Sequence, residues 1–474
     1  MTKLREIKIN AFEMNTIGHL SGGLWSHPRD KSLGYKTLEY WTDLAKTLEA
    51  GLFDGIFLAD VLGLYDVYKD GPETALQYGS QVPNNDPLLI IPPMAAVTKH
   101  LCFAATAVLS FEPPYTFARR ISTLDHLTRG RIGWNIVTGY LDSAARGAGQ
   151  AQQVGHDQRY EIAQDYMDAV YKLWEGSWHD DAVVADVNQQ TYARPDLVRP
   201  IHHNGPHYQI DAVHLSEPSP QRTPVLFQAG TSEKGKAFAS RNAEAVFLNG
   251  KSKTSVTAHI ADIRRRAVAL GRDQYDVKAF VELCVVTDKT EKLARAKYQD
   301  YLSHGTIEAT LALQSGWLGT DFAKLDLDQP LSYFESNAIR SGVETLTKEA
   351  AAQKVWTARD LARDTIVGGS TTTLVGTPEY IADALQEWQR DTDCDGFNIS
   401  HAIRTETFTD FIELVVPELQ RRGVFKRAYG EGTYREKLFG HGRSRLAAPH
   451  PATAVRHPPA PLEMAFEEYV NEPD

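Results

Sequence analysis

Cysteine is scarce in this sequence, and long apolar runs are absent. Three of the 474 residues are cysteines, Cys102, Cys284 and Cys394, and each stands alone in an apolar segment. Isolated cysteines exclude a disulfide framework and a thiolate metal site, and they are typical of core residues in a reducing compartment. The N-terminus has no signal-peptide apolar region and no run is long enough to cross a membrane, so we expect a soluble cytoplasmic protein.

Motifs of several common protein classes are missing as well. The formal net charge is −11, without a basic block or stripe, so nucleic acid is not an expected partner. No HExxH, G-x-S-x-G or G-x-G-x-x-G motif occurs, and the nearest glycine cluster, residues 146–149, lacks the third glycine. His202, His203 and His207 have the spacing of metal ligands, but no carboxylate joins them in a compact motif. We therefore expect them to fill a hairpin, predict no metal site, and favour a small-molecule ligand.

What is present is the alternation of an α/β protein. Apolar residues make up 42% of the chain, and short apolar or β-branched segments alternate with longer segments of helical periodicity. The expected strands are 7–15, 53–60, 101–110, 131–138, 224–230, 245–249, 277–288 and 396–400. The expected helices are 38–50, 88–100, 116–128, 158–174, 234–242, 254–270, 291–304, 378–391 and 410–422. This pattern predicts a (β/α)8 TIM barrel.

Four long stretches interrupt the rhythm. Residues 61–86, 139–157, 175–222 and 305–373 each exceed an ordinary connection. We expect one barrel domain over residues 1–446 with these stretches as insertions, and an extended C-terminal tail over residues 447–474 that can reach a neighbouring subunit. Barrel enzymes place their chemistry in the loops after the strands, so the enlarged loops predict a lidded pocket.

Polar or small residues recur where the predicted strands end. They are Glu13, Asn15, Asp60, Thr106, Asn135, Thr138, Gly230, Ser232, Asn249, Asn398 and His401. Because the carboxyl ends of parallel strands meet at one face of a barrel, these residues are candidates for a shared site. The alternative is that the strands simply end in polar caps.

Two segments have the features of a phosphate site. Residues 228–235 (QAGTSEKG) follow a strand and open a helix, so their backbone N–H groups can receive a phosphate, although an ordinary βα turn has the same pattern. His156 and Tyr160 begin another helix four residues apart and share one face, where they can clamp a phosphate. An N-terminal capping segment with an aromatic core anchor is the alternative for this pair.

A histidine follows the first predicted strand in a glycine-rich stretch, residues 18–25 (GHLSGGLW). This residue, His19, would face the barrel mouth. Imidazole titrates near neutral pH and can donate or carry a proton there. A lone loop histidine is more often structural or solvated, so both interpretations stay open at this point.

Motifs spread over most of the chain resemble one enzyme family. They include residues 53–68 (FDGIFLADVLGLYDVY), 119–128 (RRISTLDHLT), 130–138 (GRIGWNIVT) and 156–160 (HDQRY), within a likeness that runs from about residue 5 to residue 440. The chain thereby resembles the nitrilotriacetate, pristinamycin and dibenzothiophene-sulfone monooxygenases, an FMN-dependent family of the bacterial-luciferase-like superfamily. The resemblance implies a luciferase-like barrel with FMN across its mouth.

The same resemblance implies a cofactor site, a partner and a catalytic residue. The family's flavin-contacting positions fall on Asp60, Thr106, His156, Tyr160 and Ser232, and the strand-end residues Gly230 and Asn135 join them as candidate FMN contacts. Family members receive reduced FMN from a separate NAD(P)H:flavin reductase, and O2 then forms a flavin peroxide that oxygenates the substrate. His19 aligns with a family histidine near the reacting edge of the flavin, which implies proton transfer or peroxide stabilisation.

The substrate implied is a small organosulfur compound such as dimethyl sulfide. The sulfone-cleaving branch carries a histidine at Trp317, which argues against an aromatic sulfone, and Gly139 replaces a hydroxyl residue of the pocket floor. Candidate pocket walls are Trp25, Tyr65, Trp134 and Trp317, although such aromatics are more often core residues.

Other functions on the same fold stay open from the sequence. They are a riboflavin lyase, a haloaromatic monooxygenase, a non-catalytic flavin-binding subunit and a deazaflavin-dependent dehydrogenase. Related barrels usually pair, so we expect a homodimer or homotetramer, with the apolar helix 410–422 as a candidate contact surface.

Overall fold

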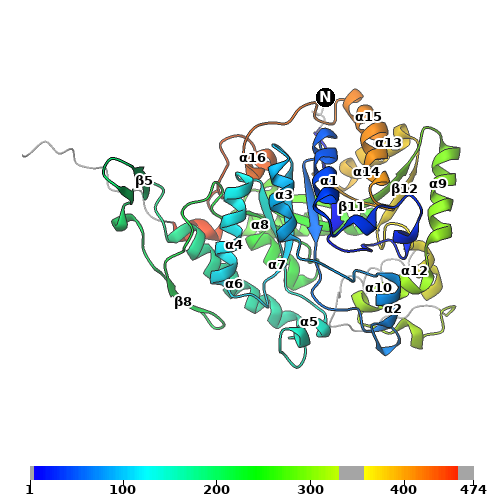
Figure 1. The fold of residues 1–474 in the computed structure, drawn as a ribbon, viewed down its shortest axis with the longest axis horizontal. Helices are drawn as coiled ribbons and strands as arrows, with labels where there is room; N and C mark the ends of the chain where they lie inside the picture. Colours follow the sequence, from blue (N-terminus) through cyan, green and yellow to red (C-terminus); the bar gives the residue numbers. More distant parts are fainter. Residues whose placement is uncertain (1–4, 330–356, 457–474) are drawn as a thin grey trace, which may run out of the picture.

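Eight parallel strands close into a barrel in a computed structural model that describes residues 5–329 and 357–456 (Figure 1). The barrel strands are β1 (Lys8–Met14), β2 (Gly55–Ala59), β3 (Cys102–Val108), β4 (Ile132–Val137), β9 (Val225–Gln228), β10 (Ala245–Asn249), β11 (Lys278–Thr287) and β13 (Gly396–Ser400). They are paired in that order, and β13 pairs back with β1, where Lys8 is in register with Gly396. All eight carboxyl ends therefore open at one face.

Helices cover the outside of the barrel (Figure 1). They are α1 (Leu38–Ala50), α3 (Ile91–Ala96), α4 (Pro114–Thr128), α6 (His156–Gly176), α7 (Glu233–Asn242), α8 (Lys253–Ala269), α9 (Glu291–His304), α13 (Pro378–Thr392), α14 (Glu406–Asp410), α15 (Val416–Arg421) and α16 (Tyr434–Phe439). In α1 the side chain of Thr37 caps the first turn, and Trp41, Leu44 and Leu48 are buried at helical spacing. The amphipathic pattern thus sets which face of the helix meets the sheet.

Aromatic side chains fill the barrel interior. Phe57, Phe227 and Phe280 are buried there and belong to one apolar cluster with Tyr434 and Leu438 of α16. Tyr434 packs on Phe227 and α16 closes the amino-terminal end of the barrel. Ligand space is consequently left at the carboxyl ends of the strands.

The eight predicted strands and the barrel are confirmed. One strand of the main sheet was not predicted: β12 (Thr372–Gly376) lies at the end of the stretch 305–373 and pairs in parallel with the outer half of β11. The expected helix 88–100 was wrong in length, because a 3-10 turn (Leu88–Ile90) precedes α3, which ends at Ala96. Pro92 and Pro93 lack the N–H groups that a continuous helix needs, so α3 can only begin there.

The predicted insertions contain short elements of their own. They are α2 (Glu73–Tyr78), α5 (Asp142–Gly147), α10 (Ile307–Leu318), α12 (Ala358–Asp364) and the hairpins β5 (Val183–Asp186) with β6 (Thr191–Ala193) and β7 (Ile201–Asn204) with β8 (Gln209–Ala212). Figure 1 shows the hairpins extending to one side of the barrel beyond α6. His202 and His203 lie in the β7–β8 hairpin, as expected, and His203 Nε2 is 2.9 Å from Asp165 Oδ1 of α6.

The C-terminal segment up to residue 456 packs on the barrel. His450 Nε2 is 2.9 Å from the Asn242 carbonyl oxygen, and Arg456 Nε donates to Glu175 Oε2 at 2.6 Å. Residues 1–4, 330–356 and 457–474 lie outside the described residues, and with them part of the predicted insertion 305–373 and of the predicted tail 447–474. Within the described ranges, no helix combines the length and hydrophobicity that crossing a membrane requires.

Candidate functional site

Three adjoining cavities occupy the carboxyl-end face of the barrel. The Ser232 cavity has a volume of about 230 Å³, the His19 cavity about 300 Å³ and the Thr106 cavity about 220 Å³. The first two share Val61, Ala229 and Thr231 as wall residues. The Ser232 and Thr106 cavities share Asp60, Leu62, Val108 and Phe111. The cavities therefore adjoin one another across the mouth of the barrel.

Two helix N-termini and a glycine turn build the Ser232 cavity. Ser232 caps α7, because its Oγ accepts a hydrogen bond from Gly235 N at 3.1 Å. His156, the first residue of α6, places Nε2 3.3 Å from the same Oγ, and its ring contacts Tyr160. A Cβ at Gly230 would lie 2.4 Å from the Tyr160 hydroxyl oxygen, so only glycine lets this hydroxyl approach the turn. Hydroxyl groups and positive helix ends suit a bound anion.

Arg159 also lines the Ser232 cavity and was not predicted. It is buried, and its Nη1 donates to the Val154 carbonyl oxygen at 2.7 Å. Its position between His156 and Tyr160 in the segment HDQRY was the available sequence signal. Burial raises the pKa of the Tyr160 hydroxyl, although hydrogen bonding to Ser232 lowers it. Tyr160 is thus a neutral hydrogen-bond donor in a positive surrounding.

Asp60, directly after β2, and Thr106, near the carboxyl end of the neighbouring β3, line the same cavity. Asn84 Nδ2 donates to Asp60 Oδ1 at 2.7 Å. Burial raises the pKa of Asp60 to about 6, while the bond from Asn84 lowers it and the nearby charge of Asp86 raises it. Asn135 Nδ2 donates to Thr106 Oγ1 at 2.9 Å from the neighbouring strand. Asn135 lines none of the three cavities, so its place is behind Thr106, which it orients.

His19 lies at the wall of its cavity against the first strand. The side chain is buried, and its ring packs edge-on against Phe12 with centroids 4.6 Å apart. Burial, followed by the positive charge of Arg404, holds the pKa of the His19 imidazole well below its usual value. The ring is therefore neutral at neutral pH and offers one N–H donor and one acceptor nitrogen.

A buried charged network supports His19 from behind. The His401 ring lies 5.6 Å from that of His19, and His401 Nδ1 is 3.3 Å from Glu13 Oε1. Arg404 Nη2 is 2.8 Å from Glu13 Oε2, and both side chains are fully buried. Glu13 and His401 were predicted as strand-end residues, whereas Arg404 was not, because it lies in a loop without a recognisable motif.

The four predicted pocket aromatics separate into two groups. Trp317 lines the His19 cavity, and its Nε1 donates at 3.0 Å to the hydroxyl of Tyr65, which lies directly behind it. Trp25 and Trp134 line none of the three cavities. Trp25 Nε1 donates to the Tyr78 carbonyl oxygen at 2.7 Å, and Trp134 packs against Phe117 in the core between sheet and helices.

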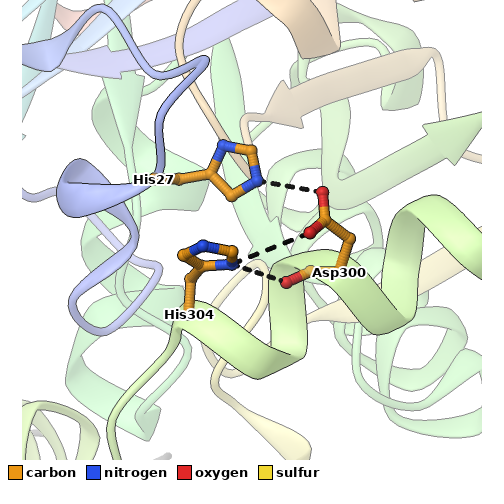
Figure 2. A group of neighbouring side chains, drawn as sticks. All are labelled: His27, Asp300 and His304. Carbon is orange, nitrogen blue, oxygen red and sulfur yellow. Dashed lines mark hydrogen bonds and ion pairs between the residues drawn. The ribbon is translucent and has the colours of Figure 1, made fainter.

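A second cluster of polar side chains lies between the segment after β1 and α9 (Figure 2). His27 Nε2 is 3.1 Å from Asp300 Oδ2, and His304 lies one helical turn from Asp300. Arg29 binds the same carboxylate of Asp300, with its Nη2 3.0 Å from Oδ2. The backbone N–H of Arg29 donates to His27 Nδ1. His27 Nε2 must then carry the proton it donates, which leaves no lone pair there for a metal. We assign this cluster to anchoring the loop on α9.

Comparisons with known proteins show which family the chain is similar to. The sequence profile of the family described as luciferase-like monooxygenase matches residues 17–393. The chain is 47% identical over 452 residues to the dimethyl-sulfide monooxygenase of Hyphomicrobium sulfonivorans, covering 95% of this chain and 94% of that protein. It is 44% identical over 457 residues to the long-chain alkane monooxygenase of Geobacillus thermodenitrificans, covering 96% and 99%. A crystal structure of riboflavin lyase with modified FMN and riboflavin superposes with a TM-score of 0.90 at 35% identity, covering 96% and 100%.

Proposed function

The chain belongs to the luciferase-like monooxygenase family, and we propose that it is a two-component enzyme that uses reduced FMN and O2 to oxygenate a small organosulfur compound. Membership confirms the resemblance and makes the protein an oxidoreductase that incorporates oxygen from O2. The cofactor proposal rests on the observation that residues distant in the sequence lie together at the carboxyl-end face of the barrel. Asp60, Thr106, Ser232 and the α6 pair His156 and Tyr160 come from four separate segments and line adjoining cavities.

The residues of the Ser232 cavity fit the phosphate of FMN. Ser232, His156 and Tyr160 supply hydrogen-bonding groups, and the N-termini of α6 and α7 supply positive partial charge. Gly230 keeps the turn free of a side chain that would displace the Tyr160 hydroxyl. The phosphate would be held here.

The other two proposed flavin-contacting residues, Asp60 and Thr106, line the Thr106 cavity. Asp60 and Thr106 would hold the rest of the cofactor, each oriented by an asparagine amide. The Asn84 Oδ1 atom is buried and has no partner among the described residues, so it is free to accept a hydrogen bond from a ligand.

Reduced FMN supplies the electrons with which O2 is activated. The chain's own contribution is to exclude water and to manage a proton. Phe12, Leu20 and Phe247 form an apolar wall of the His19 cavity, which keeps water from the reacting centre. His19, neutral beside that wall, holds a proton on one ring nitrogen and can accept one on the other.

A small substrate fits the His19 cavity. Its volume of about 300 Å³ is at the lower end of the range for ligand sites. The similarity to dimethyl-sulfide monooxygenase supports a thioether, and the match to riboflavin lyase keeps a flavin substrate as the second candidate. His19 in the cavity wall favours an enzyme over a non-catalytic flavin-binding subunit. A separate flavin reductase is the proposed partner, while a homodimer or homotetramer and a cytoplasmic location stay predictions.

One assay tests the proposal. The purified chain is given FMN, an NADH:flavin reductase, O2 and, in turn, dimethyl sulfide, an alkanesulfonate, a haloaromatic and riboflavin, and products are identified by mass spectrometry. Oxygenated product from the thioether, and none when O2 is withheld, is expected. Turnover without O2 on a deazaflavin cofactor would contradict the monooxygenase assignment.

The phosphate assignment makes a separate prediction for Tyr160. Replacing it with phenylalanine should raise the Kd of FMN about tenfold or more, since a hydrogen bond to a charged group contributes about 1.5–3 kcal/mol. Titration calorimetry with FMN and with riboflavin measures this, because riboflavin has no phosphate and should lose nothing. Tyr115→Phe, which removes a hydroxyl bound to the Val213 carbonyl oxygen outside the cavities, is the matched control. Equal weakening of both flavins would refute the phosphate role.

A further inference from the structure

A buried carboxyl group lies at the wall of the His19 cavity. Glu282 stands on β11, in register with Asn249 of β10 and Asn398 of β13. Its side chain lines the cavity and is 5% exposed. No role follows for it from the family motifs quoted above, and no flavin-contacting position falls on it.

The carboxyl group of Glu282 is only partly satisfied by the protein. Its Oε1 atom is buried and has no hydrogen-bond partner among the described residues. Burial raises the pKa of Glu282 to about 8, and hydrogen bonding to Ser400 lowers it only in part. At neutral pH the group is therefore mainly protonated and can donate as well as accept a hydrogen bond.

Several other polar groups of the same cavity have protein partners, whereas Nδ1 of His19, like Oε1 of Glu282, is buried without one among the described residues. Gln314 Nε2 donates to Ser370 Oγ at 2.8 Å, and Ser255 Oγ is 3.2 Å from His259 Nε2. Lys251 is paired with Asp364. Unlike Gln314, Ser255 and Lys251, Glu282 has an oxygen atom, Oε1, that is free to form a hydrogen bond with a ligand.

The apolar residues around Glu282 determine how its carboxyl group affects substrate binding. Phe12, Leu20 and Phe247 line the same cavity and give apolar contact to any hydrocarbon part. A hydrocarbon that filled the cavity would seal an unpaired carboxyl group, which is costly, whereas a heteroatom could pair with it. Of two substrates with the same shape, the one with a heteroatom that can pair with Glu282 would therefore bind more tightly.

We propose that Glu282 is a specificity-determining residue whose carboxyl group hydrogen bonds to the heteroatom of the substrate and thereby favours a thioether over the alkane of the same shape. The inference rests on the proposed monooxygenase function and narrows its substrate class. A thioether and an alkane are the substrate classes named for two similar proteins, a dimethyl-sulfide and a long-chain alkane monooxygenase.

Diethyl sulfide and n-pentane test the proposal, because they differ only in a sulfur atom replacing a methylene group. The ratio of their kcat/KM values is measured with a flavin reductase, FMN and O2 for the wild type, Glu282→Leu and Glu282→Gln. Glu282→Leu is expected to lower the thioether-to-alkane ratio at least about tenfold, with the change mainly in KM. Glu282→Gln keeps a donor and an acceptor of the same shape and should stay within about threefold of the wild-type ratio.

Several results would overturn the proposal. They are an unchanged ratio in Glu282→Leu, an equal loss in Glu282→Gln, or a loss of FMN affinity that explains the effect. Glu282→Leu removes a buried oxygen atom that has no partner among the described residues, so this variant should remain folded. Glu282→Met provides a second apolar variant. If the wild type oxygenates neither compound but acts on another substrate, the proposed substrate class is wrong. That result differs from an unchanged ratio in Glu282→Leu, which would refute only the role of Glu282.

The pH profile supplies a readout that a merely structural residue would not move. For the wild type, kcat/KM for diethyl sulfide should be constant below about pH 8 and fall above it, because the ionised carboxylate no longer donates. The titratable groups lining the same cavity are His19, Lys251 and His259, and Cys284 follows on β11. Glu282→Gln leaves all of these in place and should remove the decline. A decline that persists in this variant contradicts the assignment.

Discussion

Replacing His19 with alanine is expected to lower product formation about 10²- to 10⁴-fold, the usual contribution of a positioned proton donor or acceptor, while the Kd of FMN changes less than about twofold. The physical reason is that the ring is buried, neutral and at the wall of the cavity next to the flavin residues. Single-turnover mixing of the FMN-loaded, reduced enzyme with O2 and dimethyl sulfide measures product per flavin, and calorimetry measures FMN binding.

Two further variants make the His19 test decisive. His19→Asn keeps hydrogen-bonding groups but cannot take up a proton near neutral pH, so it should recover less than about a tenth of the wild-type rate if proton transfer limits turnover. His126→Ala removes a partly buried histidine of α4 that lines none of the cavities and serves as the control. Wild-type product yield in His19→Ala would end the catalytic assignment.

Removing the charge of Arg404 should cost more stability than any other single change considered. Arg404 and Glu13 are both fully buried, and the guanidinium group also donates to the carbonyl oxygens of Met14 and Thr16. Burial raises the pKa of Glu13 to about 7 even beside Arg404, so without Arg404 the carboxyl group must stay charged without a partner or take up a proton. Breaking a buried ion pair typically costs about 3–5 kcal/mol. Arg404→Met should therefore lower the free energy of unfolding by about 3–5 kcal/mol in urea denaturation.

The partner residue and an exposed pair control this prediction. The double variant Glu13→Gln with Arg404→Met should regain part of the loss, because no charge then stays buried alone. Arg421→Met breaks an exposed pair with Glu418 and should cost less than about 1 kcal/mol. A loss of similar size in Arg404→Met and Arg421→Met would contradict the argument from burial.

The barrel itself was readable from local patterns. The strand 245–249 and the helices 38–50 and 291–304 were predicted with the bounds that the structure has, because apolar periodicity and capping residues such as Thr37 and Thr290 act within a few residues. The strand β12 was missed although residues 371–375 (TTTLV) are mostly β-branched, because they lie at the end of the long stretch 305–373 that was assigned as an insertion.

Site residues could be predicted from the sequence only where they stand at a strand end or within a motif. Asp60 and Ser232 follow strands and Thr106 lies near the carboxyl end of one, and the closed barrel does bring them to one face. The direction of an aromatic side chain was not readable in the same way. Trp134 lies between sheet and helices, whereas Trp317 lines a cavity, although both stand in apolar segments.

The sequence by itself determined the class of fold, the family and the set of residues at the strand ends, because these depend on local spacing and on motifs. Only the tertiary structure decided that Arg404 and Glu13 form a buried pair behind His19 and that Glu282 lines the cavity wall with a free oxygen atom. The reason is physical. A strand such as β11 is buried on both faces and shows no alternation, so which side chains point inward is set by closure and register of the barrel.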